Sequence, residues 1–155
     1  MTIYSGAIHG TFTIERSYQA SPSRVFEAWA DPAIKARWFI GPESWTLIRR
    51  AQEFRVGGEE ILHGKFASGA ETLYVGRFHA IKRNRRLVFS CDMHYEGSHL
   101  SVSLATVELE GKGAGTHLRF TKQAVFLDGK DGTLSRERGT AAHLDRLGEA
   151  LKATA

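Results

Sequence analysis

Hydrophobic and polar residues alternate along most of this chain, with the two-residue period of a β-strand. The first such segment is residues 9–20, where Phe12 and Ile14 alternate with threonine and glutamate. Further segments follow between residues 45 and 123, where no helical period competes. Turn sequences separate them at hairpin-sized intervals, at residues 57–58, 68–69, 82–85, 96–97 and 111–115. The pattern predicts one strand, followed later by about six consecutive antiparallel strands.

Two short helices are predicted between the first strand and the others. Ser21-Pro22 and Asp31-Pro32 each place a capping side chain before a proline, whose missing N–H would have no partner in the first turn. Ile34 and Trp38 are four residues apart, as on one helical face, and Gly41-Pro42 ends the second helix. We expect the two helices to form a V-shaped element.

The last segment, residues 133–153, has the period of an amphipathic helix. Its apolar residues recur in three- and four-residue steps, at Ala141, Leu144, Leu147 and Leu151. A sheet of this size has an apolar face to bury, and this helix is the only predicted element large enough to cover it. The fold class is therefore predicted as α+β, with a curved antiparallel sheet of about seven strands wrapped around a long C-terminal helix. One domain is expected over residues 1–155.

One predicted strand, residues 100–109, changes the face that carries its apolar side chains. The two sets are Leu100, Val102 and Leu104 on one face, and Val107 and Leu109 on the other. A β-bulge near residues 105–106 would produce this change, and bulges help a sheet to curve. We therefore expect a bulge there.

Composition and charge narrow the class of protein. Apolar residues make up 42% of the chain and charged residues 25%, which is ordinary for a globular domain. There is no apolar run of membrane-spanning length and no secretory signal, so we expect a cytoplasmic protein. The single cysteine, Cys91, excludes an internal disulfide. The net charge of +4 requires neither nucleic acid nor another anionic partner.

Several short motifs keep a fixed order along nearly the whole chain. They are Ser21-Pro22 with Val25-Phe26 and Ala28-Trp29, Asp31-Pro32 with Trp38, Phe54 to Gly58, Gly76 to Phe78, Arg86 to Phe89, and Arg138-Gly139 through Leu144 and Leu147. Together they resemble the SRPBCC superfamily, with its START-like or birch-pollen-allergen-like helix-grip fold. Within it, the chain is similar to the family of activator of heat-shock-protein-90 ATPase homologues.

The resemblance implies a cavity between the sheet and the last helix that takes a hydrophobic or amphipathic molecule. Residues on the strand and helix faces expected to meet there are the candidate ligand-binding set. They are Trp38, Tyr74, Phe78, Phe89, Cys91, Met93, Leu118, Phe120, Leu144, Leu147 and Leu151. Packing in a filled core is the competing interpretation of each.

Other polar groups point to no specific chemistry. His94, Glu96 and His99 surround one predicted turn, but their spacing matches no standard metal site. Cys91 has no base beside it in the sequence, so a buried, inert thiol is expected. The basic residues of the turn at 82–86 lack the interleaved aromatic residues of a nucleic-acid surface. We predict no catalytic residues, no metal, no cofactor and no nucleic-acid partner.

Three functions remain open from the sequence. The first is a small-molecule binding protein. The second is an enzyme of polyketide-cyclase or hydrolase type, in which Tyr74, His63 or His79 would act as acid or base. The third is a chaperone-linked interaction role, which only the family resemblance implies; the eukaryotic activators have an additional N-terminal domain, for which 155 residues leave no room. We favour the first, and a homodimer is left open.

Overall fold

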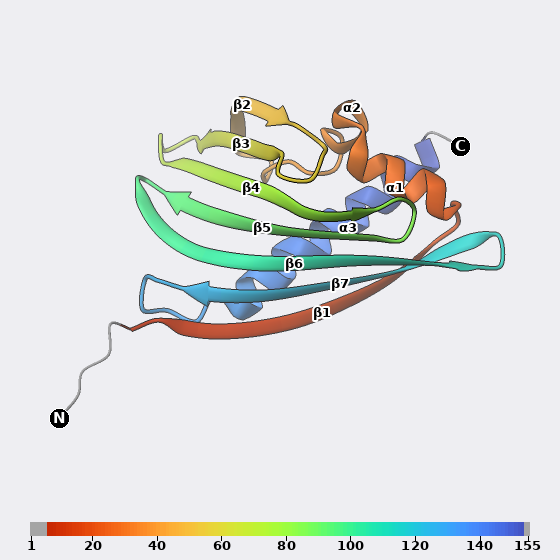
Figure 1. Ribbon diagram of the computed structural model, residues 1–155. Coiled ribbons are helices and arrows are strands. Elements are labelled where there is room, and N and C mark those ends of the chain that lie inside the picture. Colours follow the sequence, from red (N-terminus) through yellow and green to blue (C-terminus); the bar gives the residue numbers. More distant parts are fainter. Residues whose placement is uncertain (1–5, 154–155) are drawn as a thin grey trace.

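A computed structural model describes residues 6–153, which form seven strands and three helices (Figure 1). In chain order the elements are β1 (Ile8–Tyr18), α1 (Pro22–Ala30), α2 (Pro32–Lys35), β2 (Trp45–Gln52), β3 (Glu59–Phe66), β4 (Glu71–Lys82), β5 (Arg86–Tyr95), β6 (Ser98–Lys112), β7 (Gly115–Phe126) and α3 (Thr133–Ala153). No helix within residues 6–153 is long and apolar enough to cross a membrane.

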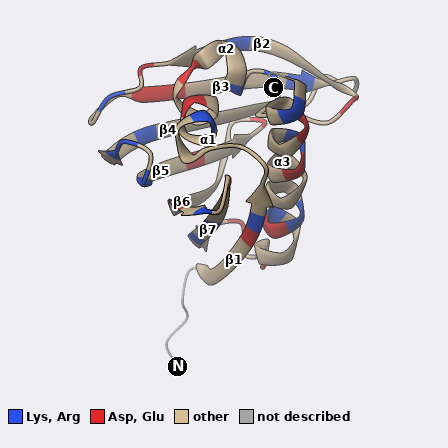
Figure 2. Cartoon of the chain, turned by 90° about the vertical axis from the view of Figure 1, so that its right-hand side faces the viewer, with Lys and Arg blue, Asp and Glu red and all other residues tan. Residues whose placement is uncertain are grey.

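The strands form one antiparallel sheet in the order β1-β7-β6-β5-β4-β3-β2. Each strand from β2 to β6 pairs with the next strand along the chain, and β7 pairs on its other side with β1. The sheet curves, and α3 lies along one of its faces (Figures 1 and 2). The prediction of an α+β helix-grip fold is thus confirmed.

The two short helices begin where the sequence predicts. The Ser21 side chain accepts a hydrogen bond from the Arg24 N–H, and the Asp31 side chain accepts one from the Ala33 N–H. These bonds satisfy amide groups that have no partner inside the helix. Asp31 ends α1 and caps α2, so the chain turns sharply and the two helices follow each other without a loop.

The core lies between the concave face of the sheet, α1 and α3. Trp29 and Trp38 pack edge-on at 4.6 Å between ring centroids, and the Trp38 Nε1–H donates to the Ala28 carbonyl at 3.0 Å. Trp38 is 1% exposed. The two tryptophans therefore join the V-shaped helix pair to the core.

The expected bulge at residues 105–106 is wrong. Strand β6 keeps an uninterrupted register with β7, and its pairing with β5 shifts only beside Met93. The inward row of β6 is continuous, and it consists of Ser101, Ser103, Ala105, Val107 and Leu109. This row begins with two buried serines, while Val102 and Leu104 are 39% and 40% exposed on the convex face. The prediction assumed that the apolar side chains of the first half of this strand are the buried ones, and that assumption was wrong.

Candidate ligand-binding site

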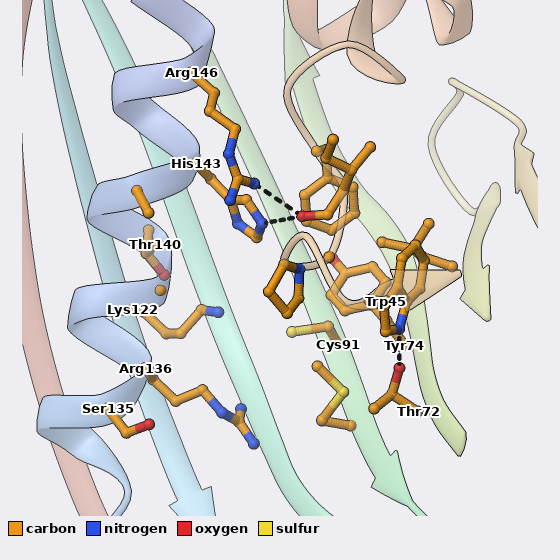
Figure 3. A pocket seen from close by; sticks show the side chains of 18 of the residues that line it. Trp45, Thr72, Tyr74, Cys91, Lys122, Ser135, Arg136, Thr140, His143 and Arg146 are labelled. Carbon is orange, nitrogen blue, oxygen red and sulfur yellow. Dashed lines mark hydrogen bonds between the residues drawn. The ribbon is translucent and has the colours of Figure 1, made fainter. Parts of the chain in front are cut away.

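A pocket of about 440 Å³ lies between α3 and the sheet (Figure 3). Its walls come from the segment after α2, from the inward faces of β2 to β5 and β7, and from α3. The lining residues are Phe39, Ile40, Gly41, Pro42, Trp45, Leu62, Phe66, Thr72, Tyr74, Cys91, Met93, Lys122, Ser135, Arg136, Gly139, Thr140, Ala142, His143 and Arg146. Within the described residues, the lining holds one lysine, two arginines and no carboxylate.

The sheet side of the pocket is largely apolar. Leu62, Tyr74 and Cys91 form a small buried cluster, against which Phe39 and Met93 pack. The ring of Phe39 stands edge-on to Tyr74 at 5.1 Å. Burial raises the pKa of Tyr74 well above its usual range, so the phenol keeps its proton at neutral pH. Tyr74 can therefore offer a ligand a hydroxyl group, but not a phenolate.

Trp45 forms one side wall, and two glycines make room for it. A Cβ atom at Gly64 would lie 2.0 Å from the Trp45 ring, and one at Gly41 would lie 2.3 Å from it. The indole Nε1–H donates to the Thr72 hydroxyl at 2.8 Å (Figure 3). Packing on both sides and this hydrogen bond hold the ring in one orientation against the pocket.

The segment at the pocket edge is held by side chains from two elements. The Ile40 carbonyl accepts hydrogen bonds from His143 Nε2 at 2.9 Å and Arg146 Nη1 at 3.0 Å, both on α3 (Figure 3). Arg50 Nη2 donates to the preceding carbonyl, of Phe39, at 2.7 Å. Three donors thus fix two consecutive carbonyls, and the pocket wall is tied to both α3 and β2.

His143 is neutral in this arrangement. Burial lowers the pKa of His143 to about 4, and the hydrogen bond to Ile40 opposes that shift only in part. Because Nε2 carries the proton that Ile40 accepts, Nδ1 of the neutral ring is an acceptor. An unfolded histidine has a pKa of about 6.5, so between pH 6.5 and 4 the unfolded state binds more protons than the folded state.

The free energy of unfolding should therefore fall as the pH drops through this window. For this one group the loss is at most about 3 kcal/mol. We expect His143→Gln to remove this pH-dependent contribution. The free energy of unfolding, measured with urea between pH 4 and 6.5, should then change less with pH in the variant than in the wild type. His9→Gln, at an exposed position, is the control and should follow the wild type. Parallel profiles for His143→Gln and the wild type would contradict this assignment.

A second, smaller cavity of about 40 Å³ lies deeper in the core. It shares Phe39, Tyr74, Lys122, Thr140 and His143 with the main pocket, and has room for a few water molecules at most. Its remaining lining residues are Trp29, Lys35, Trp38, Phe89, Phe120 and Leu144.

Beside the small cavity is a buried ion pair. Lys35 Nζ lies 2.7 Å from Glu60 Oε1, and the two side chains are 3% and 4% exposed. Burial lowers the pKa of Lys35, and the Glu60 charge raises it again. The pair connects α2 to β3, and so it joins the segment before the pocket edge to the sheet.

The predicted site residues fall into three groups. Tyr74, Cys91 and Met93 line the main pocket. Trp38, Phe89, Phe120 and Leu144 line the small cavity, as Tyr74 also does. Phe78, Leu118, Leu147 and Leu151 line neither and are buried in the core. Contact of any of them with a ligand stays a prediction.

The sequence interpretation missed the polar part of the pocket. Lys122, Arg136, His143 and Arg146 were not among the candidates, although all four line it. One signal was available, because Lys122 follows Leu118 and Phe120 at two-residue spacing and so belongs to the inward row of β7. A lysine at an inward position between apolar residues of the same strand indicated that a charged group faces the space between the sheet and α3.

The other histidines considered from the sequence lie outside the pocket. His63 Nε2 donates to Glu71 at 2.8 Å, and His79 is hydrogen-bonded to Ser90 at 2.7 Å. The His94 and His99 rings stack at 4.5 Å near the β5–β6 turn. Among the described residues, no three His, Cys, Asp or Glu side chains are grouped so as to hold a metal ion.

Sequence and structure comparisons place the chain in a family. The family model of Activator of Hsp90 ATPase homolog 1-like protein matches residues 19–152. The chain therefore belongs to this family, and the resemblance drawn from its motifs is confirmed. None of the curated proteins matches the chain.

Solved structures of bacterial proteins share the fold over nearly the whole chain. A putative uncharacterized protein from Rhizobium leguminosarum is 35% identical, covering 95% of this chain and 97% of its own, with a TM-score of 0.90. The Mll3558 protein from Rhizobium loti is 40% identical, covering 93% and 98%, with a TM-score of 0.87. An AHSA1-like protein from Aeromonas hydrophila, 23% identical over 94% of each chain with a TM-score of 0.74, supports the fold alone.

Proposed function

We propose that this protein binds a small hydrophobic or amphipathic molecule in the pocket between α3 and the sheet. The observation that carries the proposal is the pocket itself, of about 440 Å³, with aromatic and aliphatic walls and a few polar groups. Small-molecule sites in proteins usually have this size and composition. The helix-grip fold is compatible with such a role. The single free thiol, Cys91, fits a reducing compartment, so we further propose that the protein works in the cytoplasm.

Gly139 offers a direct test, because it lines the pocket without supporting the core. A Cβ atom there would meet nothing within 4 Å. A side chain on a helix leans toward the helix N-terminus, so a new one would lie over Ser135 and Arg136, which also line the pocket. Glycine is also an unfavourable residue inside a helix, so replacing it should not unfold the protein.

We expect Gly139→Phe to fill the pocket and weaken the binding of Nile red, a neutral lipophilic dye, by about tenfold or more in a fluorescence titration, which corresponds to about 1.4 kcal/mol. Gly139→Ala is the matched control. It should bind the dye as the wild type does and unfold at a higher urea concentration, by about 1 kcal/mol in stability. Wild-type affinity in a folded Gly139→Phe variant, or no binding of the dye by the wild type, would refute the proposed site.

A further inference from the structure

We propose that the ligand of this pocket is an anion, and that its single acidic group is held between Lys122 and Arg136. This inference rests on the proposed function and adds the class of ligand. The apolar body of the molecule then lies against the wall formed by Trp45, Phe66 and Met93.

Lys122 is the one charged residue in the inward row of β7 (Gly115–Phe126). From residue 118 onward this row is Leu118, Phe120, Lys122, Ala124 and Phe126, and the residues paired with Lys122 on the two neighbouring strands are Phe12 and Ala105. Within residues 6–153, the Lys122 ammonium makes no hydrogen bond and no ion pair. Its contact is with the Phe120 ring, at 5.8 Å from the centroid. Lys122 is half-buried, and a charge partly removed from water is less favourable without a partner than with one.

Arg136 comes from the first turns of α3 and faces the same space (Figure 3). Its guanidinium lies over the Phe126 ring at 5.6 Å, and within the described part of the chain it has no hydrogen bond or ion pair. The carboxylate that acts on it, Asp128, is not within ion-pair distance and accepts a hydrogen bond from the Lys130 N–H instead. Burial and the Arg136 charge both lower the pKa of Lys122, so the two cations act on each other.

The other cations around the two cavities differ from this pair. Lys35 is bound to Glu60, Arg146 donates to the Ile40 carbonyl, and Arg50 donates to the Phe39 carbonyl. Each of these has a structural partner. Lys122 and Arg136 have none among residues 6–153, and both face a pocket whose lining has no carboxylate. An acidic ligand group would supply the missing partner for both.

The geometry also indicates where the rest of the ligand goes. In Figure 3, Lys122 and Arg136 lie on the α3 side of the pocket and point toward Cys91. Trp45 and Tyr74 lie on the far side, beyond Cys91. The cationic end and the aromatic end are therefore separate. A rigid aromatic acid, with a carboxylate at one end and an apolar ring system at the other, matches this division.

The test compares two probes of nearly equal shape, 2-naphthoate and 2-naphthamide, by isothermal titration calorimetry at pH 7.5. Charge-assisted hydrogen bonds are stronger than neutral ones, so we expect the acid to bind the wild type about tenfold more tightly than the amide. Lys122→Met and Arg136→Met should each lose most of this preference while their affinity for the amide changes little. Lys82→Met, which removes an exposed lysine elsewhere, should keep the full preference.

Equal affinity of the wild type for acid and amide would overturn the inference, as would no detectable binding of the acid, or an unchanged preference in both pocket variants. Nile red separates this failure from failure of the proposed function. If the dye still binds in a manner that depends on Gly139, the pocket is a binding site and only the anion is wrong. Unchanged dye affinity in Lys122→Met also shows that this variant keeps its pocket.

Discussion

Replacing Glu60 with alanine is expected to lower the free energy of unfolding by about 3–5 kcal/mol. The substitution leaves the Lys35 ammonium buried, at 3% exposure, without its counter-charge. Aromatic rings then surround it, with centroids at 4.9 Å for Phe39 and 5.5 Å for Trp29. Contacts of a cation with ring faces offset only part of that cost. Urea unfolding monitored by circular dichroism measures the difference.

Two further variants decide whether the charge is the cause. Glu59→Ala removes an exposed carboxylate one residue earlier on β3, and it should change stability by less than about 0.5 kcal/mol. The double variant Lys35→Met/Glu60→Leu removes both charges and should recover most of the lost stability, because no uncompensated charge remains. A double variant as unstable as Glu60→Ala would show that shape, rather than charge pairing, governs this position.

Trp38→Ala is expected to be comparably destabilising, by about 3–5 kcal/mol. Trp38 is 1% exposed, packs on Trp29, and donates to the Ala28 carbonyl at 3.0 Å. Its removal would enlarge the existing 40 Å³ cavity, and a larger void in a packed core is costly. Thermal unfolding of the variant beside the wild type is the measurement.

Trp38→Phe separates the packing role of this residue from a ligand-binding role. Phenylalanine keeps an aromatic ring but loses the hydrogen bond to Ala28, so a smaller loss of stability, of about 1–2 kcal/mol, is expected. Because Trp38 lines the small cavity and not the main pocket, Nile red should bind this variant with wild-type affinity. Weaker binding by a stable Trp38→Phe variant would assign Trp38 to the ligand site instead.

Much of the fold could be predicted because local chemistry determines it. Serine or aspartate before proline marks both short helices, and the last helix spans residues 133–153 as its apolar spacing predicts. The bulge failed for an equally local reason. Ser101 and Ser103 occupy inward positions that the prediction reserved for apolar side chains, and burial of a strand depends on its partners rather than on its own composition.

The polar half of the site was less accessible from sequence. Lys35 and Glu60 are 25 residues apart, and only the placement of α2 against β3 brings them together. His143 meets the Ile40 carbonyl across 103 positions. Such contacts depend on tertiary packing, for which a single sequence carries no period or motif. The inward position of Lys122 was the exception, since strand alternation alone predicts it.

The pairing of β1 with β7 also bears on how the chain folds during synthesis. β1 leaves the ribosome first, but β7, its partner within the described residues, begins about 100 positions later. At translation rates of about 5–20 residues per second, β1 precedes β7 by roughly 5–20 seconds, and in that time Phe12 and Ile14 lack the core partners that bury them in the folded protein. The charged side chains of Glu15 and Arg16 reduce the tendency of such an open edge to pair with other chains. The sheet therefore cannot be completed, nor its concave face covered, until β7 and α3 have been synthesised.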